Sequence, residues 1–182
     1  VDHISTLPDQ IYGFFAELIV PPGPPFPEPL HLSRACAIVW CSTLPADETA
    51  ALLAPFRAFR KPVVDFVGPM PLRILNGMFD VMYPKGTRAY WKGDFFDSVP
   101  DEVIALHEKY GQRLPGVQST MHLYPIDGAA ARVPADATAW GHRDARFSEV
   151  ILGADAVASN DALGSGWARD YWMAVHPYSC GA

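Results

Sequence analysis

The placement of proline constrains this chain more than any other feature of its sequence. Eighteen of the 182 residues are proline, about twice average usage. Six of them lie between residues 21 and 29, where neither a helix nor a strand ladder can continue. We predict a stiff, extended connector there. Other prolines stand where helices are expected to start, at Pro45, Pro71 and Pro100.

Composition narrows the class of protein. The chain is 49% hydrophobic and 19% charged, which argues against disorder, and no run of about 18 apolar residues predicts a membrane span. A net charge of −6, without a Lys/Arg cluster, argues against nucleic acid or anionic lipid as the main partner. The length suits a single domain over residues 1–182. Because the chain begins at Val1, we expect a fragment or a processed product.

Three cysteines carry no pairing pattern. Cys36, Cys41 and Cys180 form neither a disulfide framework nor a zinc-binding spacing, so we predict no metal site. Cys36 and Cys41 lie in an apolar run and are predicted to be buried, reduced thiols. No signal peptide is recognisable, and the expected compartment is the reducing cytoplasm.

The hydrophobic pattern predicts alternating strands and helices. Strands are expected at 12–20, 34–42, 63–67, 87–96, 117–124, 129–133, 137–142 and 146–153. The strand at 34–42 is apolar on both faces and reads as a central strand. Helices are expected at 45–59 (kinked or ended by Pro55), from Pro71, after a capping box at Ser98, and at 160–175 with Ser159 as cap. The order predicts an α+β fold: a large, mostly antiparallel sheet with helices on one face and a polar, aromatic other face.

Alternation selects the candidate site residues. Tyr90 and Lys92 share one strand face, which leaves Trp91 for the core, and His122 and Tyr124 share a face of a later strand. We expect these four polar side chains to line the uncovered face of the sheet, where they could hydrogen-bond a substrate or cofactor. A solvated Lys92 and a structural His122 are the plainer alternatives.

His142 and Arg143 form a second candidate pair, next to Asp144. They are interpreted as a local hydrogen-bonded knot, with contact to an anion as the alternative. The sequence lacks the G-x-S-x-G, Walker, G-x-G-x-x-G and H-E-x-x-H signatures. A cofactor-free hydrolase using His122 or His142 is the weakest hypothesis, because no nucleophile is paired with either histidine.

Several short runs, taken in order, resemble one family. The chain resembles the C-terminal, substrate-binding half of FAD-linked oxidases of the berberine-bridge-enzyme (BBE) type, most specifically from Pro69 onward. The runs are Tyr90-Trp91-Lys92, Pro125-Ile126-Asp127-Gly128-Ala129, Arg132-Val133, Thr138 to Ala145, Trp167-Ala168-Arg169 and Pro177-Tyr178-Ser179.

The resemblance implies a function. Family members place the open face of this sheet over the flavin, so Tyr90, Lys92, His122 and Tyr124 would face flavin and substrate. The implied cofactor is FAD, which accepts a hydride from a small organic substrate. The implied partner is an FAD-binding domain, upstream or on another polypeptide, which this sequence lacks. Alone, the chain is expected to be inactive and to bind FAD weakly.

The sequence leaves the catalytic residue unassigned and allows one alternative function. In plant members the catalytic base lies on the strand after the His-Arg motif, where this chain has Val150, with Glu149 on the opposite face, so the catalytic residue is unassigned. The alternative function is a stand-alone module that binds a small ligand, or forms a homodimer, through the exposed sheet face.

Overall fold

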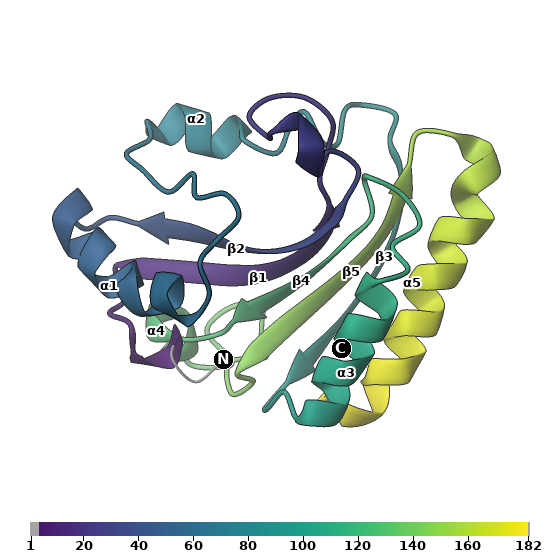
Figure 1. The fold of residues 1–182 in the computed structure, drawn as a ribbon. Helices are drawn as coiled ribbons and strands as arrows, with labels where there is room; N and C mark the ends of the chain where they lie inside the picture. Colours follow the sequence, from purple (N-terminus) through teal and green to yellow (C-terminus); the bar gives the residue numbers. More distant parts are fainter. Residues whose placement is uncertain (1–3, 182) are drawn as a thin grey trace.

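The computed structural model describes residues 4–181 and is built on one antiparallel sheet (Figure 1). The strand order across the sheet is β2-β1-β4-β5-β3, and every neighbouring pair is antiparallel. The strands are β1 (Ile11–Ile19), β2 (Arg34–Ser42), β3 (Arg88–Phe96), β4 (Thr120–Pro125) and β5 (Phe147–Asp155). The predicted α+β class is confirmed.

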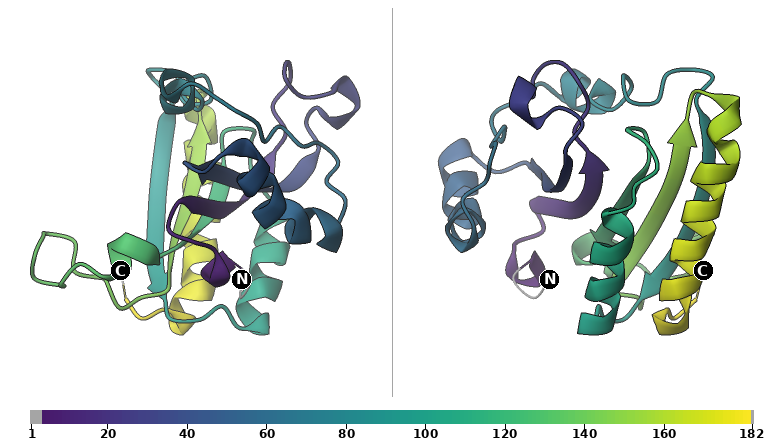
Figure 2. Two further views of the ribbon diagram at one scale, coloured as in Figure 1. Left: turned by 90° about the vertical axis from the view of Figure 1, so that its left-hand side faces the viewer. Right: turned by 45° about the vertical axis from the view of Figure 1, so that its right-hand side comes forward.

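Two helices lie side by side across one face of the sheet, which we call the helix face (Figures 1 and 2). They are α3 (Asp101–Gly111) and α5 (Asp161–Val175). The others are α1 (Ala46–Phe59), α2 (Leu72–Gly77) and α4 (Gly128–Ala131). The loop that carries α4 projects from the other side of the sheet, which we call the second face (Figure 2). Within residues 4–181, no helix is both long and apolar enough to cross a bilayer.

The core lies between the helix face and these two helices. Met121 and Ile151 are fully buried on adjacent strands, and Tyr171 and Val175 of α5 pack over them. Burial of such side chains stabilises each by roughly 1.5–3 kcal/mol. Alternate residues of the strands and one face of α5 thus pack together in a single apolar layer.

Most predicted elements are present, but three short strands are not. Residues 63–67 are irregular, and residues 129–133 and 137–142 form α4 and an extended loop. Short apolar runs do not separate strand from loop or helix by pattern alone. These three runs find no partner strand in the described part of the chain, so their backbone groups are not held in a ladder.

The prediction that residues 34–42 form a central strand is wrong, because β2 is an outer strand of the sheet. Its apolar side chains are therefore only half covered. As a consequence Cys36 and Cys41, predicted to be buried, are exposed free thiols, and so is Cys180.

Prolines precede the helices as expected. Pro45, Pro71 and Pro100 each occupy the position just before the first helical residue. The predicted side-chain caps are absent: neither Ser98 nor Ser159 caps the helix that follows it. Helix α1 also continues through Pro55 to Phe59, so the expected early end does not occur.

Candidate functional site

Strand register decides which predicted site residues share a face. Residues directly opposite one another in an antiparallel pair project to the same side of the sheet. Lys92 on β3 and Met121 on β4 both pair with Ile151, whereas His122 pairs with Val150. Lys92 therefore lies on the helix face, and His122 lies on the second face.

The expectation that four candidates line one face does not hold. Tyr90 and Lys92 lie beneath α5: Tyr90 packs against the core, and Lys92 Nζ is 4.2 Å from the centre of the Trp172 ring. Alternation within a strand is readable from sequence, but the relation between two strands depends on their register, which the sequence pattern left undetermined. Only His122 and Tyr124 remain on the second face.

His122 and Tyr124 form an aromatic cluster with Phe14 of β1. His122 Nδ1 is 2.6 Å from Tyr124 Oη, and the Phe14 ring centre is 5.1 Å from the imidazole and 4.7 Å from the phenol ring. Burial lowers the pKa of His122 to about 4, and burial followed by the nearby Tyr83 raises the pKa of Tyr124. Both groups are consequently neutral at pH 7. One hydrogen bond joins His122 Nδ1 to Tyr124 Oη, and the tautomer of His122 decides which of the two atoms donates.

A cavity of about 480 Å³ opens beside this cluster. Tyr12 and Tyr124 line it from the sheet, and Asp127, Arg132 and Trp140 line it from the loop after β4. Tyr12 Oη donates a hydrogen bond to the Pro125 carbonyl (2.9 Å), and burial raises the pKa of Tyr12 to about 12. The cavity thus combines aromatic walls with a few polar groups, as small-ligand sites do.

Charged groups at the cavity rim are mostly engaged with one another. Arg132 forms an ion pair with Asp9. Burial, and secondarily the charge of Asp9, raises the pKa of Asp127. Arg132 is therefore neutralised locally, and Asp127 is the acidic group that faces the cavity without a salt bridge among the described residues.

His142 and Arg143 lie in the loop that follows α4. Arg143 donates to the Ala130 carbonyl (3.0 Å) and to Thr138 Oγ1 (2.7 Å), and its guanidinium lies 4.2 Å from the Trp140 ring centre. His142 stacks on Phe95 with ring centres 4.2 Å apart. These contacts fold the loop against the second face.

Sequence reasoning missed the aromatic residues that β1 and β3 contribute. Tyr12 and Phe14 alternate with Ile11 and therefore share the second face, a signal that was readable once 12–20 was taken as a strand. Trp91, predicted to be core, is 58% exposed on the same face. Trp91 does project to the face opposite Lys92, as predicted, but the core lies on the face that carries Lys92.

Buried acids form a separate polar group on the helix face. Asp94 and Glu149 are directly paired across β3 and β5, and each is 1% exposed. Burial, then the charges of Asp94 and Glu17, raises the pKa of Glu149 to about 8. Burial lowers the pKa of His107 to about 4, so its 3.4 Å contact with Glu149 is not an ion pair at pH 7. Both Glu149 carboxyl oxygens lack a hydrogen-bond partner.

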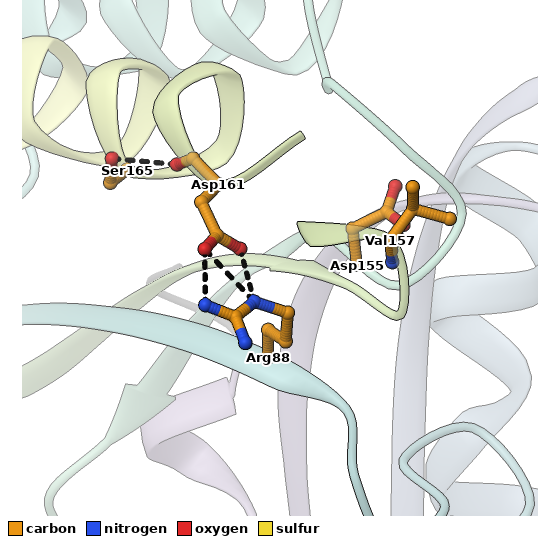
Figure 3. Close-up of polar contacts among 5 residues, drawn as sticks. All are labelled: Arg88, Asp155, Val157, Asp161 and Ser165. Carbon is orange, nitrogen blue, oxygen red and sulfur yellow. Dashed lines mark hydrogen bonds and ion pairs between the residues drawn. The ribbon is translucent and has the colours of Figure 1, made fainter. Parts of the chain in front are cut away.

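An exposed ion pair joins the start of β3 to the start of α5 (Figure 3). Arg88 Nε lies 2.6 and 2.9 Å from the two carboxylate oxygens of Asp161, and a guanidinium nitrogen completes the bidentate contact. One turn further along α5, Ser165 Oγ donates a hydrogen bond to the Asp161 carbonyl oxygen (2.7 Å). These contacts orient the first turn of α5 and leave Arg88 with its charge already paired.

Among the described residues, no group of three or more His, Cys, Asp or Glu could hold a metal ion.

The geometry defines an α+β domain with a helix-covered face and an aromatic second face. No family model and no curated protein matches the sequence. Solved structures do match: BBE-like 1 of Physcomitrella patens (14% identity, TM-score 0.71), the Bermuda grass isoallergen BG60 (16%, 0.71) and BBE-like #28 of Arabidopsis thaliana (13%, 0.67). The resemblance expected from sequence is confirmed: the chain has the fold of the C-terminal domain of BBE-like oxidases.

The match is nearly complete for this chain and partial for the others. It covers 97–98% of this chain but only 39%, 36% and 38% of the Physcomitrella, Bermuda grass and Arabidopsis proteins. This chain therefore corresponds to well under half the length of those structures.

Proposed function

We propose that this chain is the substrate-binding domain that covers the flavin of an FAD-dependent oxidoreductase acting on a small organic substrate. The observation that carries the proposal is the fold match over 97–98% of the chain, joined to an aromatic second face. The rest of the enzyme, an FAD-binding domain upstream or on another polypeptide, is part of the proposal. A cytoplasmic location is also part of the proposal, and it rests only on the three cysteines, which show no disulfide pairing pattern.

The second face fits a flavin ring. An isoalloxazine is flat and apolar with a polar edge, and it is complementary to aromatic faces next to a few hydrogen-bonding groups. Trp91, Phe14 and Tyr124 supply the rings, and the cavity at Tyr12 supplies space and hydroxyl groups. Arg132 is already paired with Asp9, so we assign ring contacts, and not phosphate contacts, to this chain.

When bound, FAD would supply the hydride acceptor. The chain's own residues would orient the substrate and exclude water. His122 is neutral at pH 7 and is held by Tyr124 through Nδ1, which leaves Nε2 as its other hydrogen-bonding atom. Val150 lies on the second face, whereas Glu149 is buried on the helix face, so Glu149 is not placed to act as base. We assign no catalytic residue.

The proposal is tested by titrating riboflavin, which carries the ring without the adenosine part, into the isotope-labelled chain. NMR shifts are expected at the Trp91 indole and at Tyr12 and Tyr124, with millimolar-range affinity. Amides of the buried helix-face residues Met121 and Ile151 should be unaffected. Absence of shifts, or shifts confined to α3 and α5, would contradict the proposal.

A matched pair of variants sharpens this test. Trp91→Ser removes an exposed aromatic side chain from the second face and should weaken riboflavin binding about 3–10-fold, the usual value of one aromatic contact. Leu163→Ser removes an apolar side chain of similar exposure (59%) from α5 and should leave binding unchanged. Equal effects of the two changes would indicate non-specific binding.

The cavity also favours a second candidate, a stand-alone small-ligand-binding module without redox activity. About 480 Å³ is within the range of small-molecule sites. In that case ligands would shift the resonances of Asp127 and Trp140, while riboflavin would shift none. The two candidates therefore give different outcomes in one titration.

A further inference from the structure

The cavity beside Tyr12 carries an uneven set of charges. It is lined by residues between 5 and 9, by strands β1, β4 and β5, and by the loop with α4 that projects from the second face (Figure 2). The charged side chains of this lining are two carboxylates, Asp9 and Asp127, and one guanidinium, Arg132. Which of these charges is already paired decides what kind of ligand the cavity suits.

Asp9 and Arg132 neutralise each other. The Arg132 guanidinium forms an ion pair with the Asp9 carboxylate. The hydrogen bond from Arg132 holds the pKa of Asp9 below its ordinary value, so Asp9 is ionised and paired at pH 7. Arg132 is the only cationic side chain among the described residues that line the cavity. An anionic ligand would therefore have to compete with Asp9 for it.

Asp127 is the charged group that is left without a partner. It occupies the position just before α4, but its side chain makes no capping hydrogen bond. Burial, and then the charge of Asp9, raises the pKa of this half-buried carboxyl group, and no described cation lowers it. A desolvated carboxylate without a partner is unfavourable, and a bound cation would offset that cost.

Two tyrosines next to Asp127 complement a cation as well. Tyr12 Oη donates its proton to the Pro125 carbonyl (2.9 Å), so this oxygen can only accept a hydrogen bond from a ligand. Burial, and then the charge of Asp127, raises the pKa of Tyr12, so the two groups are neighbours. Tyr12 and Tyr124 both line the cavity, and the faces of such rings attract cations.

Much of the remaining wall is apolar. Leu7, Ile11 and Ile126 line the cavity, and Trp140 lines it from the loop. The Trp140 ring already holds the Arg143 guanidinium 4.2 Å from its centre, so we assign to Trp140 an apolar contact and not a second cation site. A ligand that fits this wall has an apolar body beside its charged group.

We propose that the cavity binds a small organic ammonium compound: a protonated amine that donates to Asp127 and Tyr12, joined to an apolar body that lies against the tyrosine rings. Its assignment as the substrate rests on the proposed function. Recognition of the ammonium group requires no reaction at its nitrogen. A neutral or anionic analogue lacks the charge that Asp127 leaves unmatched.

The first experiment is an NMR titration of the isotope-labelled 182-residue chain with benzylamine, which is protonated at pH 7. Shifts are expected at the side chains of Tyr12 and Tyr124 and at the Asp127 amide, with a dissociation constant on the order of 1 mM. Benzyl alcohol keeps the ring without the charge, and benzoate reverses the charge. Both should bind at least about 10-fold more weakly, because neither makes the charge-assisted hydrogen bond to Asp127.

A matched pair of variants locates the contact. Asp127→Asn removes the charge, keeps the shape and suits the position before a helix equally well. It should weaken benzylamine binding about 10-fold and leave the binding of benzyl alcohol unchanged. Asp170→Asn makes the same change of net charge at an exposed position of α5, and it should change neither. The ligand series on the unmodified chain keeps the test decisive if Asp127→Asn does not fold.

Three results would overturn the inference. One is benzyl alcohol binding as tightly as benzylamine. Another is equal weakening of benzylamine binding by Asp127→Asn and Asp170→Asn, which would indicate general attraction to an acidic chain. The third is the absence of shifts at the cavity residues up to about 20 mM benzylamine.

The riboflavin titration separates this inference from the proposed function. Riboflavin binding without benzylamine binding would overturn the ammonium site and leave the flavin-covering role in place. Benzylamine binding without riboflavin binding would support the ammonium site and contradict the flavin-covering role. The cavity would then be the ligand site of a stand-alone module.

Discussion

Glu149 shows how burial sets the chemistry of one residue. Its carboxyl group is enclosed between β5 and the helices, beside Asp94 and without a hydrogen-bond partner. Because its pKa is raised from 4.5 to about 8, the folded chain holds a proton that the unfolded chain has already lost at pH 7. This contribution to stability is complete below about pH 4.5 and is lost as pH rises through about 8.

We therefore predict that Glu149→Gln, which keeps the shape and stays neutral, becomes more stable than the original chain as pH rises. The difference between the two unfolding free energies should grow by about 2–4 kcal/mol between pH 5 and pH 8. Urea unfolding at several pH values measures it. A difference that stays constant with pH would show that Glu149 is ionised in the folded state.

His122 has the opposite dependence. Its pKa is lowered from 6.5 to about 4 by burial, so the folded chain keeps this imidazole neutral while the unfolded chain protonates it. The stability it contributes is present above pH 6.5 and declines as pH falls through about 4. NMR of the imidazole carbons should show His122 to be about 10% protonated at pH 5. A midpoint near 6.5 would indicate that this side chain is open to water.

At the scale of elements, α5 touches β5 where two glycines meet. A methyl group added to Gly153 would stand 2.1 Å from the Gly164 carbonyl oxygen, whereas one added to Gly164 would lie 3.4 Å from its nearest neighbour. Backbone atoms cannot move aside as a flexible side chain would. The close approach of strand and helix therefore depends on Gly153 more than on Gly164.

The two positions provide a matched test. Gly153→Ala should destabilise the chain by about 1–3 kcal/mol, because the helix must shift away from the sheet. Gly164→Ala should be neutral or stabilising by up to about 1 kcal/mol, because alanine favours the helix. Thermal and urea unfolding compare them. Similar losses from both changes would show that α5 does not approach β5 so closely.

Under the proposed function, the chain as a whole contacts the flavin ring and makes no contact with the phosphates of FAD. We predict that the chain alone binds FAD no more than about threefold more tightly than riboflavin, because the adenosine diphosphate part would gain nothing here. Flavin fluorescence titrations measure both constants. FAD binding that is tenfold tighter or more would show that this chain also holds the phosphates, and it would contradict the proposed division between two domains.

Residue patterns predicted much of the local structure. The bounds of β2 and the start of β3 agree with prediction to within a residue, because apolar runs ended by proline and polar residues leave little choice. The strands predicted at 63–67 and 137–142 are absent, because a strand exists only where a neighbouring strand pairs with its backbone groups. Pattern alone does not identify that neighbour.

The sequence by itself determined the α+β class, the positions of the long elements and the alternation of side chains along each strand, because these depend on local sterics and period. Only the tertiary structure decided that Lys92 and His122 lie on opposite faces, that β2 is an edge, and that Glu149 is enclosed. Register and strand order are set by contacts between residues far apart in the chain, and a shift of one residue would move every side chain to the other face.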